Sequence, residues 1–255
     1  MASILNLLIA AGTAILSIRL LSVGLYRRYR IFFLYLIFET LHTGILASLG
    51  QAGRAYEKVW VVTEPLEWFF FALVVLEIYA LVLQDYKGLS TVGRWSLIAA
   101  MVVAMLASGI ILIAPSQYAQ SHVITYYYVA ERAVNLSLAV FLLSILGLLM
   151  RYPLTLSRNI VVHSMVFSVY FLANAVLYLL LSMAGLNASA PWVTYTISAI
   201  TLAAIGTWLV MLNPAGEFRK QRVRPRWMPG QEEQLVNQLN HLNAALLRAT
   251  GNRPK

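Results

Sequence analysis

The chain contains no cysteine, and charged residues make up only 11% of its 255 amino acids. Without cysteine it can form no disulfide, no thiolate metal site and no cysteine nucleophile. Hydrophobic residues account for 60% of the chain, which is more apolar surface than a water-soluble fold of this length can enclose. We therefore expect an integral membrane protein, with the lipid bilayer as its first partner.

Recognisable catalytic motifs are also missing. Lysine is absent from the long apolar stretches, which excludes the retinal Schiff base of a microbial rhodopsin; the lysines are Lys58, Lys87, Lys220 and Lys255. Four scattered histidines cannot supply the ligands of a metal-dependent intramembrane hydrolase, and no Gly-x-Ser-x-Gly string marks a serine nucleophile. An enzyme is therefore the least supported class, and we expect no cofactor.

Seven apolar stretches are each long enough to cross the bilayer. A helix rises about 1.5 Å per residue, so about 20 residues span a hydrocarbon core about 30 Å thick. Short connections separate the stretches, so consecutive helices should be antiparallel neighbours. We predict an all-α seven-helix bundle over residues 1–213, with spans at Ala2–Leu25, Ile31–Leu49, Thr63–Gln84, Trp95–Ala114, His122–Met150, Asn159–Ala184 and Trp192–Leu212.

Basic residues mark one side of this bundle. Lys and Arg accumulate after the first, third and fifth spans and in the tail, whereas the alternate gaps hold only Arg54 and Lys58. Because cytoplasmic loops retain Lys and Arg, we predict the amino terminus outside and the carboxyl terminus in the cytoplasm, in a bacterial inner membrane. The net charge of +9 then reports topology rather than nucleic-acid binding. The first span contains Arg19 and lacks a basic leader, so we expect no cleaved signal peptide.

Ionisable side chains inside the spans are the strongest functional leads, because a charge at the bilayer centre costs at least about 2.5–3.5 kcal/mol. Glu39 and His42 lie three residues apart, on one face of the second span. Such a pair could pass a proton, share one in a pH switch, or only fix the packing of the helix. A metal site is less expected, since a di-iron bundle needs two Glu-x-x-His motifs and the chain has one.

The fifth span carries a polar stripe in its outer half, formed by Tyr127, Tyr128, Glu131, Arg132 and Asn135. Successive positions on a helix diverge by about 100°, so Glu131 and Arg132 cannot simply neutralise each other. Arg132 should instead reach a carboxylate on another helix, either Glu39 or Glu67. The stripe is then either a static interhelical clasp or one wall of an outward-facing polar pocket.

The start of the third span has two interpretations. Thr63, Glu64 and Pro65 resemble a helix start, with a threonine cap, proline in the first turn and an acid at the positive end of the dipole. Glu67 lies one turn deeper, which weakens that explanation for it. If the helix instead begins earlier, at Val59, Pro65 breaks a backbone hydrogen bond and kinks the span near the same pocket.

Two further charges lie toward the inner ends of their spans. Arg19 in the first span and Glu77 in the third are each about two turns from that end, so they could form a pair at similar depth. Arg19 could also extend along its span to the headgroup region.

The sixth span presents one continuous face at 4-3-4-4 spacing, made of His163, Phe167, Tyr170, Asn174 and Tyr178. Aromatic stripes of this kind usually form packing surface, and a cavity lining is the alternative. The seventh span adds hydroxyls that commonly bond to their own helix or to a neighbour, at Thr194, Ser198 and Thr201.

The composition changes after Asn213-Pro214. Residues 214–230 form a basic juxtamembrane segment, which suits an anionic leaflet or serves as ordinary stop-transfer charge. Residues 231–255 are predicted to form a cytoplasmic amphipathic helix, with leucines at 4-3-4 spacing. Two heptads are too short to be stable alone, so this helix should dock on its own loops, on a second copy or on another protein. The leucines are Leu235, Leu239, Leu242 and Leu246.

These features favour a sensing or signalling-accessory module that uses an outer polar pocket and a cytoplasmic tail helix. A small solute or proton-coupled transporter is the first alternative, although no paired, broken helices support it. A structural subunit of a membrane complex is the second, in which the buried charges only hold helices together. The predicted pocket residues are Glu39, His42, Glu67, Tyr128, Glu131, Arg132, Asn135, Tyr170 and Asn174.

Overall fold

The computed structural model describes residues 2–49, 54–84, 95, 98–99, 122–151, 155–183, 191–218, 220–222 and 231–249. Within these ranges the chain forms eight α-helices, one 3-10 turn and a two-stranded sheet. The helices are α1 (Ala2–Ser22), α2 (Arg30–Leu49), α3 (Arg54–Val82), α5 (His122–Arg151), α6 (Arg158–Met183), α7 (Pro191–Met211), α8 (Pro214–Phe218) and α9 (Gln231–Ala249). Most of the predicted span Trp95–Ala114 lies outside the described residues.

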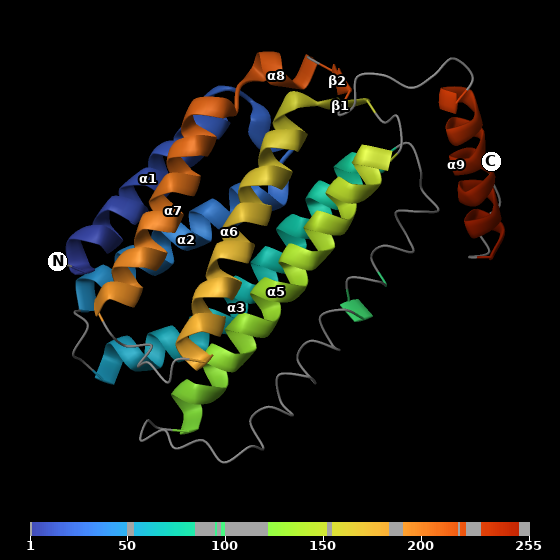
Figure 1. Cartoon of the computed structure of the whole chain (residues 1–255). Helices are drawn as coiled ribbons and strands as arrows, with labels where there is room; N and C mark the ends of the chain where they lie inside the picture. Colours follow the sequence, from blue (N-terminus) through green and yellow to red (C-terminus); the bar gives the residue numbers. More distant parts are fainter. Residues whose placement is uncertain are drawn as a thin grey trace.

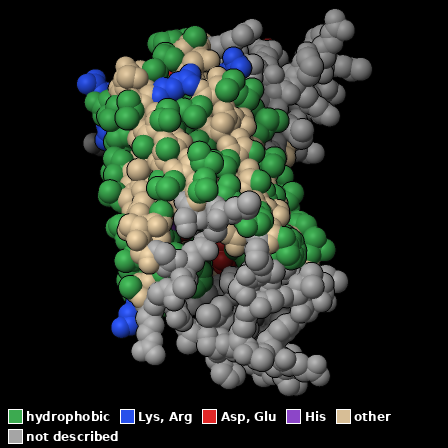
Figure 2. Space-filling model, turned by 90° about the vertical axis from the view of Figure 1, so that its left-hand side faces the viewer, with side chains coloured by type: hydrophobic (Ala, Val, Ile, Leu, Met, Phe, Trp, Pro, Cys, Tyr) green, Lys and Arg blue, Asp and Glu red, His purple; other side chains and the backbone are tan. Residues whose placement is uncertain are grey.

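Five of the described helices are long and apolar enough to cross a membrane. Their surfaces are the reverse of a water-soluble protein, because large apolar side chains such as Ile4, Ile18 and Val169 are exposed, and apolar side chains cover the flank in Figure 2. The chain is therefore a multi-pass helical membrane protein. The five segments are Ile4–Ser22, Arg30–Leu49, Lys58–Val82, Arg158–Leu180 and Trp192–Met211.

The long helices pack side by side in one bundle (Figure 1). Helix α1 lies against α2 and α7, α3 lies against α2, α5 and α6, and α6 also packs on α5 and α7. The short connections make neighbours antiparallel, as the loop lengths predict. The core between them is rich in aromatic side chains, with Phe32, Leu36 and Phe171 fully buried.

Helix α3 begins at Arg54, so the prediction that the third span starts at Thr63 is wrong. Pro65 lies inside the helix, where it cannot donate the usual bond to the residue four positions earlier. The Thr63 hydroxyl does not cap a helix start, since it donates to the carbonyl of Val59 one turn earlier, at 2.7 Å. The alternative interpretation, in which the helix begins before Thr63 and contains Pro65, is confirmed, although the helix begins at Arg54 rather than at Val59; the kink at Pro65 stays a prediction.

A small sheet departs from the all-α prediction. Strand β1 (Thr155–Ser157) pairs antiparallel with β2 (Lys220–Arg222), with Leu156 opposite Gln221. Helix α8 turns the chain back toward this strand; Asn213 caps it by accepting the N–H of Gly216 on Oδ1, at 2.7 Å, and Pro214 occupies the first helical position. Three-residue strands carry too little alternation to be recognised in the sequence.

The tail helix α9 docks on the chain itself through part of its leucine stripe. Leu239 is buried and belongs to the main hydrophobic cluster, and Leu246 packs partly buried against that cluster. Leu242 remains half exposed, so the stripe does not bury as one face. The side chain of Leu235 lies outside the described residues.

Candidate functional site

A cavity of about 590 Å³ lies between six helices, at the end of the bundle where α1 begins and α2 ends. Four carboxylates and one imidazole line it, those of Glu39, Glu64, Glu67, Glu131 and His42. Figure 2 shows acidic atoms recessed in the lower part of the flank. The other described lining residues are Asn6, Ile9, Thr43, Leu46, Tyr56, Trp60, Phe71, Asn135, Tyr170, Asn174, Tyr178, Val193, Thr194, Ile197, Ser198 and Thr201.

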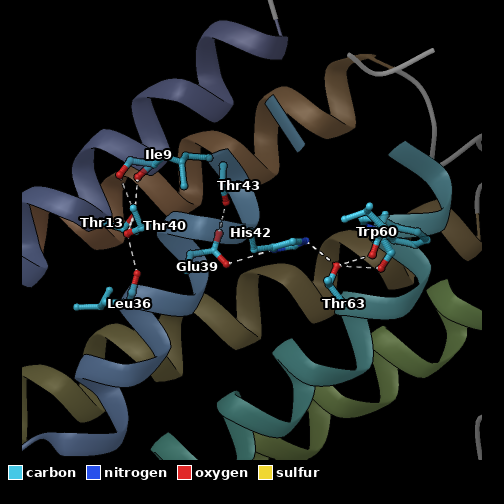
Figure 3. A network of polar contacts seen from close by, with 11 residues as sticks. Ile9, Thr13, Leu36, Glu39, Thr40, His42, Thr43, Trp60 and Thr63 are labelled. Carbon is cyan, nitrogen blue, oxygen red and sulfur yellow. Dashed lines mark hydrogen bonds and ion pairs between the residues drawn. The ribbon is translucent and has the colours of Figure 1, made fainter. Parts of the chain in front are cut away.

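Helix α2 presents three polar side chains to the cavity on one face. Glu39, His42 and Thr43 stand at spacings of three and four residues, which places them together on the same side of a helix. The Thr43 hydroxyl donates to Glu39 Oε1 at 2.8 Å. Glu39 Oε2 points toward His42 Nδ1 at 3.8 Å, which is too long for a hydrogen bond (Figure 3).

Helix α3 orients the other nitrogen of this imidazole. Thr63 Oγ1 lies 2.9 Å from His42 Nε2, and its single hydroxyl proton is donated to the Val59 carbonyl at 2.7 Å. The oxygen therefore accepts from Nε2–H, because a hydroxyl has one proton and two lone pairs. This arrangement leaves Nδ1 as the unprotonated nitrogen, turned toward Glu39 (Figure 3).

Three buried acceptors at this site have no hydrogen-bond donor within the described structure. They are Glu39 Oε2, His42 Nδ1 and Asn135 Oδ1, on residues that are all buried. An unsatisfied buried polar group costs about 1–3 kcal/mol, and more if charged. These acceptors suit a ligand that carries positive charge or hydrogen-bond donors.

The opposite wall comes from α5 and α6. The Tyr178 hydroxyl donates to Glu131 Oε1 at 2.7 Å, and Asn135 Nδ2 donates to the Glu131 carbonyl at 2.9 Å. Asn174 Nδ2 likewise bonds back to the Tyr170 carbonyl, so its amide oxygen remains available to the cavity. These bonds hold the side chains of the wall in place.

Below the cavity the bundle closes. Glu39, Tyr170 and Thr201 also line a second void of about 10 Å³, which is roughly the minimum that holds one water molecule. Beneath it, Phe32 contacts His163 with ring centroids 4.3 Å apart, and the rings of Trp208 and Phe167 pack on them. We call this group of four rings, Phe32, His163, Phe167 and Trp208, the aromatic layer.

The aromatic face predicted on the sixth span, now α6, forms a cavity lining along one part and a packing surface along the other. Tyr170, Asn174 and Tyr178 line the cavity, whereas His163 and Phe167 belong to the aromatic layer. His163 is fully buried, and neither of its ring nitrogens has a hydrogen-bond partner among the described residues. It serves there as a packing ring among aromatic neighbours.

A polar clasp ties the opposite end of the bundle together around Glu217, the acidic residue of α8. The Tyr29 hydroxyl and Asn159 Nδ2 both donate to Glu217 Oε1, at 2.6 and 2.8 Å, and Arg28 Nε forms an ion pair with Oε2 at 2.9 Å. Asn159 also donates to the Asn213 carbonyl. Burial, reinforced by the Glu217 charge, raises the pKa of Tyr29 above its ordinary value.

The predicted pairing of Arg19 with Glu77 is wrong. Arg19 Nη2 instead donates to the Leu212 carbonyl, at 3.0 Å, and thereby caps the end of α7. Glu77 accepts the backbone N–H groups of Ile31 and Phe32, at 2.9 and 3.0 Å. The free N–H groups at the start of a helix attract a carboxylate. Glu77 therefore binds the start of α2 rather than Arg19, although Arg19 is expected at a similar depth in the membrane.

The structure brings seven predicted residues together around the cavity: Glu39, His42, Glu67, Glu131, Asn135, Tyr170 and Asn174. Arg132 is half-buried and does not line it; its clasp to Glu39 or Glu67 stays a prediction. The side chain of Tyr128 lies outside the described residues. The assignment of Glu64 to a helix start is wrong, because α3 begins at Arg54; Glu64 lines the cavity, three residues before Glu67 on the same helix face. The clasp around Glu217 was missed.

The chain matches no protein-family model, no curated protein and no solved structure.

Proposed function

We propose that the chain is a seven-span inner-membrane sensing module, with its amino terminus outside, that binds a ligand in the cavity and signals at its cytoplasmic end. One observation carries this proposal. The polar cavity occupies one half of the bundle, while below it, in the part of the chain that the structure describes, the aromatic layer packs α2, α6 and α7 tightly together. A site that is open on one side and sealed on the other suits recognition rather than passage.

Helix α7 provides the route between the two ends. Thr194, Ser198 and Thr201 stand at the cavity, and Trp208 of the same helix lies in the aromatic layer. The helix ends where Arg19 binds Leu212, next to the residues that enter the clasp. A small displacement at the cavity would therefore reach the clasp through one continuous helix.

The clasp end bears the charge expected of a cytoplasmic face. Arg27, Arg28 and Arg30 lie there and are exposed, and Lys and Arg side chains gather along the upper edge in Figure 2. Retention of basic residues in the cytoplasm supports this orientation. Helix α5, 30 residues long, and the stretch Trp95–Ala114 complete the proposed seven spans.

The second candidate function is a proton- or cation-coupled transporter, which the four cavity carboxylates favour. It requires the cavity to open alternately to both sides. The aromatic layer would have to separate for that to happen.

Thiol labelling distinguishes these functions, because the chain has no cysteine of its own. We would introduce Thr194→Cys and Thr201→Cys in the cavity, and Phe218→Cys on exposed α8, and apply a membrane-impermeant thiol reagent to cells and to inverted vesicles. The sensing proposal expects both cavity cysteines to react only in cells and the α8 cysteine only in inverted vesicles. Reaction of a cavity cysteine from both sides would support the transporter instead.

A further inference from the structure

We propose that the cavity binds a divalent transition-metal cation through Glu39, His42 and Glu67, which names the ligand of the sensing site proposed above and rests on it. One donor atom from each of these side chains lies within 4.8 Å of the other two. Two come from α2 and one from α3, so the site joins two neighbouring helices near the cavity wall. The three side chains are buried or half-buried.

The hydrogen bonds around Glu39 and His42 point to a cation. Nδ1 of His42 and Oε2 of Glu39 face each other without any donor between them, at 3.8 Å. Two acceptors in this position repel each other unless something positive lies beside them. A metal ion accepts an electron pair from Nδ1 and from Oε2 at the same time. A water molecule would offer only two weaker hydrogen bonds, and an apolar ligand would offer none.

Hydrogen bonds from neighbouring residues hold Glu39 and His42 in the way that ligand side chains are held in metal sites. Thr63 accepts the N–H of His42 Nε2 at 2.9 Å, which orients the ring and leaves Nδ1 to bind the ion. Thr43 holds Glu39 Oε1 at 2.8 Å and leaves Oε2 toward the cavity. Such outer contacts fix the tautomer and the direction of metal ligands.

The geometry requires only small movements. Tetrahedral ligands of Zn²⁺, with bonds of about 2.1 Å, stand about 3.4 Å apart. Atoms that now lie within 4.8 Å reach this arrangement by moving less than about 1 Å each, through side-chain rotation. The cavity leaves room for a fourth ligand from solution, so the site would be open rather than closed as in a structural zinc site.

Charge and donor type select the class of ion. Two carboxylates inside a bundle are costly, and a divalent cation neutralises them without adding net charge. An imidazole with two carboxylates suits Zn²⁺, Fe²⁺, Co²⁺ or Mn²⁺ better than Ca²⁺, and the absence of thiolate disfavours Cu⁺. A single ion needs one Glu-x-x-His, so the argument against a di-iron bundle does not apply to it.

The test uses the full-length protein, purified with a tag that contains no histidine and stripped with a chelator. Zn²⁺ is then added alone and bound metal is counted by equilibrium dialysis, and Co²⁺ is added separately to record visible absorption bands. We expect one Zn²⁺ per chain and a Co²⁺ spectrum with nitrogen and oxygen ligands. Glu39→Gln, His42→Gln and Glu67→Gln should each weaken binding at least 10-fold, and Thr63→Val should weaken it about 10-fold or more.

Matched controls lie on the tail helix α9. Glu233→Gln and His241→Gln change the same residue types at exposed positions and should leave Zn²⁺ binding unchanged. Failure of the wild-type chain to bind one Zn²⁺ would overturn the proposal, even if a site variant does not fold. Equal binding by all folded site variants would do the same, and Glu39 with His42 would then have only a structural role.

The thiol-labelling experiment keeps this proposal separate from the proposed function. If the protein binds no Zn²⁺ but the cavity cysteines react only from outside, the metal site is overturned and the proposed sensing function still stands. Reaction from both sides overturns the sensing function, whether or not Zn²⁺ binds.

Discussion

At the scale of single residues, threonine hydroxyls and amide groups decide what the charged side chains can do. Thr43 and Thr63 each hold one end of the Glu39–His42 pair, so the pair faces the cavity with its free acceptors. At the other end of the bundle, Asn159 holds Glu217 in the same way. The ionisable residues attract attention in the sequence, but their uncharged neighbours set their orientation.

Gly216 is predicted to be indispensable to the clasp. A Cβ atom at this position would collide with the Asn159 side chain, which already binds Glu217. Gly216→Ala should therefore destabilise the protein by about 1–3 kcal/mol, measured as a lower melting temperature in detergent. Gly206→Ala is the control, since no atom lies within 4 Å of its added Cβ; equal melting temperatures for the two variants would contradict the clasp geometry.

Tyr29 should make alkaline stability depend on the clasp. Its hydroxyl donates to Glu217, and burial raises its pKa above the ordinary 10.0. The folded chain keeps this proton where the unfolded chain loses it, so the contribution is fully present below pH 10 and declines as the pH rises further.

Tyr29→Phe should therefore cost about 1.5–3 kcal/mol near neutrality and show a smaller loss of stability than wild type above pH 10. Melting curves of both proteins across this pH range provide the measurement. Parallel curves would mean that Tyr29 titrates as it does in the unfolded chain.

At the scale of elements, two of the long helices, α2 and α7, are capped by a charged side chain from another helix. Glu77 of α3 accepts the N–H groups of Ile31 and Phe32 in the first turn of α2, and Arg19 of α1 donates to the Leu212 carbonyl directly after α7. In a bilayer these free backbone groups cannot be satisfied by water. The charged residues near the span ends therefore serve as caps across helices.

Glu77→Ala should destabilise the start of α2 by about 0.5–2 kcal/mol, the usual range for loss of a helix cap. Glu77→Gln should cost less, because its amide oxygen still accepts one of the two N–H groups. Thermal melting of both variants, and hydrogen exchange at Ile31 and Phe32, would measure this. Unchanged exchange at these two amides in the alanine variant is the result that contradicts the cap.

At the scale of the whole molecule, the two ends of the bundle differ: one contains the acidic cavity, and the other contains the aromatic layer and the clasp. The cavity, with its carboxylates, lies where α1 begins, and the exposed Arg27, Arg28 and Arg30 lie near the clasp. This polarity is what the proposed sensing function uses. It also sets the orientation that we expect in the membrane.

Reporter fusions would measure that orientation. Fusions after Arg28, Lys87 and Arg158 should all report a cytoplasmic position, and protease added outside intact cells should spare the tail. A fusion within residues 50–53, in an opposite connection, is the control and should report the outside. An external reading at any one of the three basic sites would remove a span from the proposed seven.

Much of the membrane architecture could be predicted from the sequence. The apolar stretches predicted the helices that the structure shows as α1, α2, α6 and α7, because hydrophobic length alone determines whether a segment can cross a bilayer. The helical spacing of Glu39 and His42 also predicted that they share a face. These properties depend on neighbouring residues along one helix, which a sequence displays directly.

Only the tertiary structure decided which side chains meet. The separate partners of Arg19 and Glu77 and the clasp around Glu217 depend on contacts between segments distant in sequence. The approach of Glu67 to Glu39 and His42 depends on the rotation of α3 against α2. Hydrophobic pattern leaves that rotation open in lipid, where every face can be apolar, and the packing and hydrogen bonding of the assembled bundle set it.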